Sequence, residues 1–449
     1  MGLRLNQRLS RLKTRLVKDP RALFYLISAA GTVLGLLLCM CWGGPLYKWM
    51  VQENDPGIRF ADYFAHIART VDPQHLYQRI SWDAMGCFPP LAYCMYYPLY
   101  RLTAPRGMIT PTNSLEAEII PGALSVFTIY LIFNAVLFYL AINSTGKQNR
   151  KKDFAIFTLL MLSVVFAGSG YMMGNSTMLV VVLLLAGLRL RESDRPMRRE
   201  GGILLIAASV ALKLYPAVFG LLFVKERKWK ELFRFILYTV LLLFGPFVFF
   251  GGTAGMISWI GHLRETMQYS DYGRLQYLTG IFHTVLKNLT NRDTTVICFV
   301  LAVAVCLVWT WLAWRSGSRY RTMFFLICIM VFFPANAYRY SLSYFSIPLI
   351  MMLKDEPPKE SRRWPLGTAS LLYGMLYTIP IWWLMVIPLS RTYTLYTLTS
   401  VEIYLYLVTY ALIAAVMLAE MTARRREDLR ILGGTRRNSG GSLKRTEEQ

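Results

Sequence analysis

Histidine, acidic residues and charged residues as a whole are scarce in this sequence. Four of the 449 residues are His, and charged residues make up 17% of the chain, where a soluble chain of this length has about 25%. The seven Cys form no CxxC pair and lie mostly in apolar stretches, so neither a zinc site nor a redox site is indicated. These shortages exclude an ordinary soluble domain and a metal site built on histidine.

Apolar residues are abundant instead. They make up 55% of the chain, and the mean hydropathy is +0.38. Long runs without an ionised side chain cover residues 23–38, 124–142, 240–250 and 295–312. A helix that crosses a bilayer needs about 20 apolar residues, because its backbone polar groups must be satisfied within the segment. The predicted fold is therefore all-α: a polytopic transmembrane helical bundle of about twelve spans, two of them expected at 154–170 and 342–353.

The formal net charge of +23 could suggest a nucleic-acid partner, but the position of the basic residues argues against one. Most Lys and Arg fall in short loops between the apolar runs, at residues 1–22, 143–153, 189–200, 225–234, 315–321, 354–364 and 421–449. Basic loops of this kind lie in the cytoplasm. Both termini are therefore predicted to be cytoplasmic, and membrane lipids, not nucleic acid, are the expected surroundings.

Three parts are expected along the chain. Residues 1–22 form a cytoplasmic basic N-terminus, residues 23–420 a transmembrane domain, and residues 421–449 a cytoplasmic basic tail that is partly disordered. Two loops of the transmembrane domain, 47–120 and 252–294, are predicted to lie outside.

The first outer loop, at residues 47–120, is longer than ordinary connections. Residues 59–70 have the pattern of an amphipathic helix, and the apolar run 87–100 is too short to span a bilayer. Further on, only a pair of short arms fits between the basic loops 189–200 and 225–234, with a turn near 211–216.

Few ionisable residues lie in or beside the apolar segments, where a charge is costly and usually functional. Asp62 follows the first span, Lys213 lies in the turn of the short pair, and Arg339 ends a later span. Loop parity places all three at the outer face, where a carboxylate can accept a proton and two cations can hold an anionic leaving group. Each also has an ordinary interpretation: Asp62 as a solvated residue, Lys213 as a snorkelling lysine, and Arg339 as an ion-pair or stacking residue.

Three sequence blocks resemble the GT-C class of membrane glycosyltransferases, and most of all glycosyltransferase family 87. The first runs from Asp62-Tyr63-Phe64-Ala65 through Tyr77 to Phe88-Pro89-Pro90-Leu91. The second is Gly174-Asn175-Ser176-Thr177, where members often have Gly-Gln-x-Asn. The third runs from Gly202 to Lys213-Leu214-Tyr215-Pro216 and the basic stretch after it. The order, spacing and topology of the blocks carry the resemblance over residues 24–420.

The resemblance implies an inverting transfer from a polyprenyl-phosphate sugar to a lipid or glycan acceptor, and the family includes bacterial mannosyltransferases of this kind. Asp62 would be the general base, with Asp55 as the alternative. The donor phosphate would lie near Lys213, Arg339, Tyr215 and Tyr340. The acceptor groove would include Tyr63, His66 and Phe88.

The resemblance also implies a location in the bacterial plasma membrane. Neither a metal nor another cofactor is expected. A lipid-linked donor is favoured over a nucleotide sugar, since no cytoplasmic segment is long enough for a nucleotide-binding domain.

A transporter or flippase of lipid-linked saccharides is the alternative interpretation, because it would need the same apolar groove and the same cations. Such transporters have inverted repeats and a site at the bilayer midplane, and the sequence contains no recognisable repeat. A structural scaffold is a third interpretation. The long outer loop that opens with Asp62 favours an enzyme.

Overall fold

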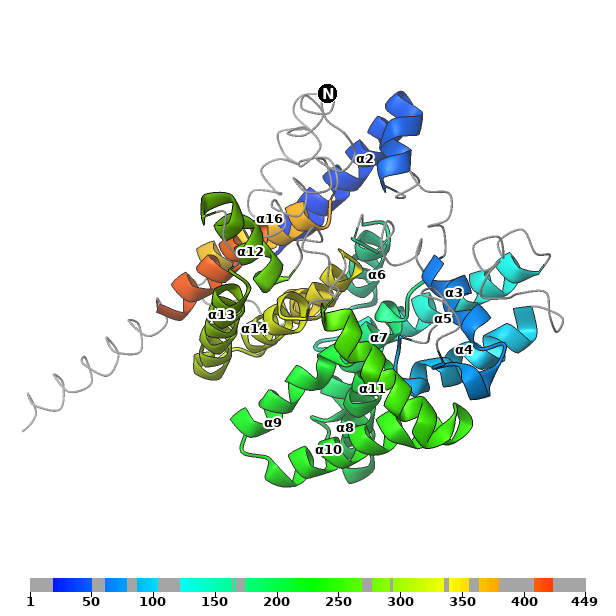
Figure 1. The fold of residues 1–449 in the computed structure, drawn as a ribbon. Helices are drawn as coiled ribbons and strands as arrows, with labels where there is room; N and C mark the ends of the chain where they lie inside the picture. Colours follow the sequence, from blue (N-terminus) through cyan, green and yellow to red (C-terminus); the bar gives the residue numbers. More distant parts are fainter. Residues whose placement is uncertain are drawn as a thin grey trace, which may run out of the picture. The chain divides into compact units, whose positions relative to one another are not determined.

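A computed structural model describes residues 19–50, 61–78, 87–103, 122–163, 165–166, 174–268, 277–290, 294–334, 339–354, 363–378 and 408–422. Within these ranges the chain forms helices and no β-strand (Figure 1). The all-α class predicted from the apolar runs is therefore confirmed for the described residues.

Within the described residues the helices begin at Ala22. The long helix α2 (Ala22–Met50) is followed by two short helices, α3 (Ala61–Arg69) and α4 (Pro90–Thr103). The later α-helices are α5 (Ala123–Ser144), α6 (Arg150–Met161), α7 (Thr177–Leu190), α8 (Pro196–Leu212), α9 (Gly220–Lys225), α10 (Trp229–Phe244), α11 (Gly252–Gln268), α12 (Leu278–Thr290), α13 (Thr295–Arg315), α14 (Arg319–Phe332), α15 (Ser346–Lys354), α16 (Arg363–Leu376) and a last helix at Val408–Thr422. Short 3-10 helices are η2 (Pro73–His75), η5 (Tyr215–Phe219), η6 (Gly245–Phe249) and η7 (Arg339–Phe345).

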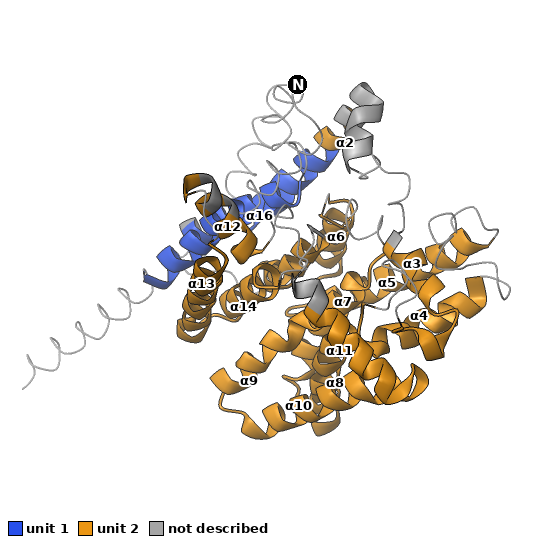
Figure 2. Cartoon of the chain, viewed as in Figure 1, with its two compact units in different colours: residues 1–33, 356–449 blue, residues 34–355 orange. Residues whose placement is uncertain are grey.

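The chain divides into two compact units (Figure 2). One unit combines residues 1–33 with residues 356–449, and within it α16 packs against the start of α2, with Gly374 beside Ile27. The other unit, residues 34–355, contains α3 through α15. All candidate site residues described below belong to this second unit.

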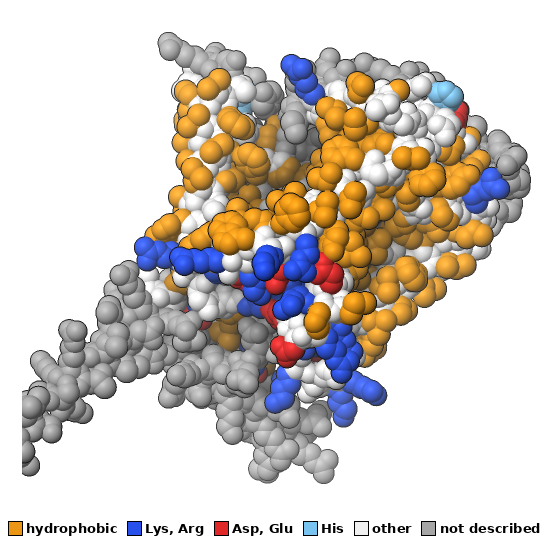
Figure 3. All heavy atoms as spheres, turned by 90° about the horizontal axis from the view of Figure 1, so that it is seen from below, with side chains coloured by type: hydrophobic (Ala, Val, Ile, Leu, Met, Phe, Trp, Pro, Cys, Tyr) orange, Lys and Arg blue, Asp and Glu red, His pale blue; other side chains and the backbone are white. Residues whose placement is uncertain are grey.

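Helices of the second unit differ sharply in what surrounds them. All nine residues of α15 are buried, as are nearly all residues of α14. By contrast α5, α10 and α13 expose large apolar side chains, for example Phe133, Leu241 and Val300. Figure 3 shows a wide area of apolar side chains on the surface. Because apolar surface of this extent is unfavourable in water, the exposed faces of these helices are suited to lipid.

Three helices of the described part are long and apolar enough to cross a membrane: Ala123–Ser144, Trp229–Phe249 and Thr295–Arg315. The protein is accordingly an integral membrane protein. Several other apolar helices are shorter, among them Thr177–Leu190 and Val408–Thr422. The count of about twelve crossings stays a prediction.

Local features of the sequence reappear in the helices. The amphipathic segment predicted at 59–70 is α3, and the short apolar run at 87–100 forms α4, which has 14 residues. The predicted turn near 211–216 is the break between the end of α8 at Leu212 and the start of η5 at Tyr215.

Two spans expected from the sequence are shorter as helices. In the one expected at 154–170 the helix α6 ends at Met161, and the one expected at 342–353 is η7 followed by the nine-residue α15. Irregular backbone at membrane depth is tolerated where protein surrounds it, and the buried surroundings of α15 fit that condition.

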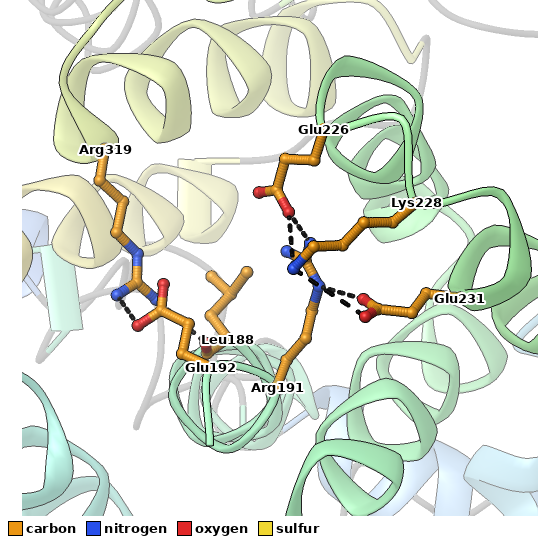
Figure 4. Close-up of polar contacts among 7 residues, drawn as sticks. All are labelled: Leu188, Arg191, Glu192, Glu226, Lys228, Glu231 and Arg319. Carbon is orange, nitrogen blue, oxygen red and sulfur yellow. Dashed lines mark hydrogen bonds and ion pairs between the residues drawn. The ribbon is translucent and has the colours of Figure 1, made fainter. Parts of the chain in front are cut away.

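The basic loops 189–200, 225–234 and 315–321 lie close together (Figure 4). Arg191 is 4% exposed and bonds to both Glu226 and Glu231, while Arg319 bonds to Glu192 and to the carbonyl of Leu188. The side of the membrane on which these loops lie stays a prediction.

Lys225 joins the same loops through hydrogen bonds to carbonyl and hydroxyl oxygens. Its Nζ donates to the carbonyl oxygens of Ala313 and Ser316, at 2.8 and 2.9 Å, and to Oγ1 of Thr322 at 2.7 Å. These bonds connect the end of α9 to the turn between α13 and α14. Lys225 therefore has a structural role in holding the basic loops in place.

Candidate active site

Asp62 lies in the first turn of α3 and accepts a short hydrogen bond from a distant part of the chain. Nδ2 of Asn175 donates to Oδ2 of Asp62 at 2.6 Å, although the residues are 113 positions apart. Asn175 is 2% exposed, whereas Asp62 is partly exposed. A carboxylate in this position is held from one side and remains accessible from the other.

The orientation of Asn175 is set by the start of α7. Its Oδ1 accepts the backbone N–H of Thr177 at 3.0 Å and the Thr177 hydroxyl at 2.8 Å. The first of these bonds is a local side-chain turn of the kind that Asn favours before a helix. With Oδ1 occupied twice, the Nδ2 side of the amide is directed to Asp62.

Gly174 allows this segment to approach α3. It has φ +62°, and a Cβ there would lie 2.6 Å from the Cβ of Tyr63. Any other residue would be strained in this conformation and would overlap Tyr63. Gly174 thus explains how Asn175 can reach the first turn of α3.

Lys213 extends the same chain of hydrogen bonds from α8. It follows the last residue of that helix, is 3% exposed, and donates from Nζ to Oγ1 of Thr177 at 2.7 Å. The helices α7 and α8 are close enough for this bond because Gly202 lies against α7, where an added Cβ would be 2.7 Å from the carbonyl oxygen of Gly187. Asp62, Asn175, Thr177 and Lys213 therefore form one connected set.

Aromatic rings surround the Lys213 ammonium. It lies 4.3 Å from the ring centroid of Tyr340 and 5.3 Å from that of Phe88. Contacts at this distance attract a cation to the ring face and are worth about 0.5–2 kcal/mol. Phe88 is held in turn by Tyr77, whose hydroxyl donates to its carbonyl oxygen at 2.9 Å.

A row of three polar residues lines one face of α3. Asp62, His66 and Arg69 are spaced by four and three residues, which places them on one side of a helix. The His66 ring stacks on Phe88 at 4.0 Å, and its Nδ1 lies 3.2 Å from both the Tyr93 hydroxyl and Nη1 of Arg69. Arg69 thus brings a second cation to the neighbourhood of Asp62.

Burial and charge shift the acid–base properties of these residues. Burial raises the pKa of Asp62 above its ordinary value, and the Asn175 hydrogen bond with the charges of Lys213 and Arg69 opposes the rise. Lys213 lies at the end of α8, outside the helices long enough to cross the membrane, and burial lowers its pKa to about 7. Burial also lowers the pKa of His66 well below its ordinary value, so that His66 is neutral near pH 7.

The structure brings together most residues singled out from the sequence. Asp62, Lys213, Tyr340, Phe88 and His66 are connected by the contacts above.

Other residues of the expected site are placed differently. Tyr63 is fully buried and packs against Phe127 of α5, so its contribution to an acceptor groove would be through packing. Tyr215 begins η5 two residues after Lys213. Arg339 begins η7, but its side chain, like the whole of Asp55, lies outside the described residues. The roles assigned to these residues stay predictions.

Sequence reasoning missed the parts that Asn175, Thr177 and Arg69 take in this site. In the sequence, Asn175 and Thr177 belong to a block that departs from the family pattern, and that departure does not indicate a contact with Asp62. The spacing of Arg69 from Asp62 was a usable signal, because residues seven apart share a helix face.

In a comparison with protein families, the model of glycosyltransferase family 87 matches residues 88–335, more than half of the chain. The matched segment includes Phe88, Asn175, Thr177 and Lys213, while Asp62 precedes it. No curated protein matches the chain.

Proposed function

The chain belongs to glycosyltransferase family 87. From this membership we propose that it transfers a hexose, with mannose as the expected sugar, from a polyprenyl-phosphate donor to a glycolipid or glycan acceptor. The reaction takes place at the extracytoplasmic face of a bacterial plasma membrane, with both termini of the chain in the cytoplasm. The observation that carries this proposal is the connected set in which a partly exposed carboxylate and a buried ammonium are joined through two side chains.

Asp62 is the general base in this mechanism. Its carboxylate takes the proton of the acceptor hydroxyl while the hydroxyl oxygen attacks the anomeric carbon of the donor sugar. The bond from that carbon to the phosphate oxygen breaks, and its electron pair leaves with polyprenyl phosphate. Attack opposite to the leaving group inverts the configuration at the anomeric carbon.

Lys213 stabilises the charge that develops on the leaving phosphate. Its ammonium is already directed by Thr177 and by the faces of Tyr340 and Phe88. A cation placed in advance where charge develops lowers the barrier without reorganisation during the reaction. Arg339, at the start of η7 next to Tyr340, is proposed as a second cation for the same phosphate.

A lipid-linked donor suits the position of this set beside an apolar helix. Tyr63 and Phe64 of α3 contact Phe127 of α5, which is one of the three helices able to cross a membrane. Further along, α5 exposes Ile129 and Phe133. A polyprenyl chain can lie along these side chains while its phosphate reaches Lys213.

The test is a transfer assay with purified protein in lipid nanodiscs. An acceptor lipid extract is offered with polyprenyl-phosphate mannose, polyprenyl-phosphate glucose, or the corresponding nucleotide sugars. We expect labelled sugar in the acceptor only with a polyprenyl-phosphate donor, and more with mannose than with glucose. Transfer from a nucleotide sugar in the absence of polyprenyl phosphate would sink the donor assignment.

A flippase would carry the labelled donor across the bilayer without forming product. In the same nanodisc preparation, movement of the donor between the two leaflets leaves the acceptor unlabelled. Product formation there therefore separates the enzyme from the transporter alternative.

A further inference from the structure

The hydrogen bonds between Lys213 and Asp62 all run in one direction. Lys213 Nζ donates to the Thr177 hydroxyl oxygen at 2.7 Å, and the Thr177 hydroxyl donates to Oδ1 of Asn175 at 2.8 Å. Nδ2 of Asn175 then donates to Asp62 at 2.6 Å. Each group in the series gives a hydrogen toward the carboxylate, so each bond polarises the next.

The amide of Asn175 cannot be reversed within this arrangement. A flip would remove both hydrogen bonds from Thr177 to Oδ1 and would turn that oxygen toward the Asp62 carboxylate. An oxygen facing a carboxylate is repulsive, and a buried acceptor that loses its donor is costly. The two donors of Thr177, its backbone N–H and its hydroxyl, therefore set which end of the amide meets Asp62.

We propose that Asn175 and Thr177 are positioning residues that hold Asp62 ionised and oriented, and that link it to the phosphate-binding Lys213. The proposal rests on the proposed function, since it assigns these residues a task within that site. A phosphate bound at Lys213 keeps the ammonium protonated and therefore keeps the first donor of the series in place. Donor binding thereby prepares the base for the acceptor hydroxyl.

The coupling is reciprocal, as any linkage between two binding events must be. An ionised Asp62 favours the charged form of Lys213, and the charged form binds phosphate. Loss of the connection at either Asn175 or Thr177 should therefore weaken both properties together.

The test compares isosteric changes at Thr177. Thr177→Val keeps the volume and the β-branched shape but removes the hydroxyl, while Thr177→Ser keeps the hydroxyl. A matched control is Ser176→Ala, since Ser176 is buried in the same turn and makes no capping bond to α7. Thermal unfolding in detergent is measured for every variant, so that a folding defect is recognised.

The first readout is the pH profile of kcat/KM. In Thr177→Val the acidic limb, which reports ionisation of Asp62, should move to higher pH. At a fixed pH on the acidic limb, kcat/KM of Thr177→Val should be about tenfold lower than that of the wild type, the equivalent of one charge-assisted hydrogen bond. The difference should disappear as the pH rises above the limb. Thr177→Ser and Ser176→Ala should keep the wild-type profile.

A second readout does not depend on turnover. Infrared difference spectra of protein with ¹³C-labelled aspartate follow protonation of carboxyl groups directly, and Asp62→Asn identifies the band of Asp62. That band should titrate at higher pH in Thr177→Val than in the wild type. It should titrate as in the wild type when Ser replaces Thr177.

The outcomes separate the two proposals. An unchanged profile and an unchanged Asp62 band in Thr177→Val, while Asp62→Asn is inactive, would overturn the positioning role and leave the catalytic base in place. An equal loss at every pH would show that Thr177 is only structural, and again overturn it. Near-normal turnover of Asp62→Asn would reject the base of the proposed function, whatever the Thr177 variants do.

Discussion

Replacing Lys213 by Met separates a phosphate-binding lysine from a lysine that is merely tolerated in an apolar setting. The Met side chain has nearly the same length and fills the space between Tyr340 and Phe88, but it has no charge. Thr177 keeps its donor bond to Asn175 and loses only the hydrogen bond that it accepts from Lys213. The change therefore removes the cation with little disturbance to its neighbours.

Lys213→Met should change donor affinity and protein stability in opposite directions. A charge-assisted hydrogen bond to phosphate is worth about 1.5–3 kcal/mol, so donor affinity should fall about tenfold or more. Stability should change in the other direction. Burial lowers the Lys213 pKa to about 7, and lowering a pKa by one corresponds to about 1.4 kcal/mol. The buried ammonium thus lowers the stability of the fold at neutral pH by several kcal/mol, and Lys213→Met removes this cost.

The sign of the pH dependence follows from the same shift. The pKa of Lys213 is lower in the folded protein than in the unfolded chain. Below its ordinary pKa, protonation of this lysine therefore favours the unfolded chain and lowers the stability of the fold. This cost is fully present below pH 7 and fades as the pH rises toward the ordinary lysine value. The stability gain of Lys213→Met should therefore be larger at pH 6 than at pH 9. In the wild type, donor binding should weaken as the pH rises through about 7, because the ammonium loses its proton.

The assay combines equilibrium binding of a labelled polyprenyl-phosphate sugar in nanodiscs with thermal unfolding of the same samples. Lys225→Met is the matched control. It removes a partly buried lysine, one that bonds to Ala313, Ser316 and Thr322 among the basic loops. It should lower the stability by about 1–3 kcal/mol and leave donor affinity unchanged. Unchanged donor affinity in Lys213→Met, or a loss of stability as large as that of Lys225→Met, would refute the reasoning.

Three further predictions concern the base, an ion pair and the topology. Asp62→Asn should lower kcat about 10²–10⁴-fold, with donor binding surviving at reduced affinity because the charge that favours the Lys213 ammonium is gone; if turnover stays near normal and is lost in Asp55→Asn, measured in the same transfer assay, Asp55 is the base. Asp153→Asn should lower the stability by about 3–5 kcal/mol, because it leaves the Lys354 ammonium, 2.8 Å from the Asp153 carboxylate, without its buried partner; a free energy of unfolding within about 1 kcal/mol of the wild-type value contradicts this. Single cysteines at Ser81 and Ser193 in a cysteine-free background should react with impermeant reagents from opposite sides of the membrane, and reaction of both from one side would remove Lys213 from the outer face.

The helices and the membrane class were predictable because they depend on composition and local pattern. As a helix, an apolar run such as the one in α13 satisfies its own backbone hydrogen bonds. The helical periodicity of apolar residues along α3 favours an amphipathic helix whatever surrounds it. Lengths were less predictable. The segment that forms η7 and α15 was expected as one span, and only burial by neighbouring protein permits its irregular backbone.

The residue types of the site were also visible in the sequence. A charge in or beside an apolar stretch is costly, so Asp62 and Lys213 stood out without a structure. The family resemblance that their surroundings suggested is confirmed by the match of glycosyltransferase family 87. The sequence by itself therefore determined the fold class, the family and the main candidates.

Only the tertiary structure decided how these candidates are connected. Asp62 and Asn175 are far apart in the chain, and their bond depends on the left-handed backbone of Gly174 and its contact with Tyr63. The bond between Thr177 and Lys213 depends on the close packing of α7 and α8. Hydrogen bonds form over less than about 3.2 Å and within a narrow angle, whereas sequence patterns specify only which face of a helix a residue occupies. The sequence therefore determined which chemical groups are present, and the packing of α3, α7 and α8 determined that they form one connected site.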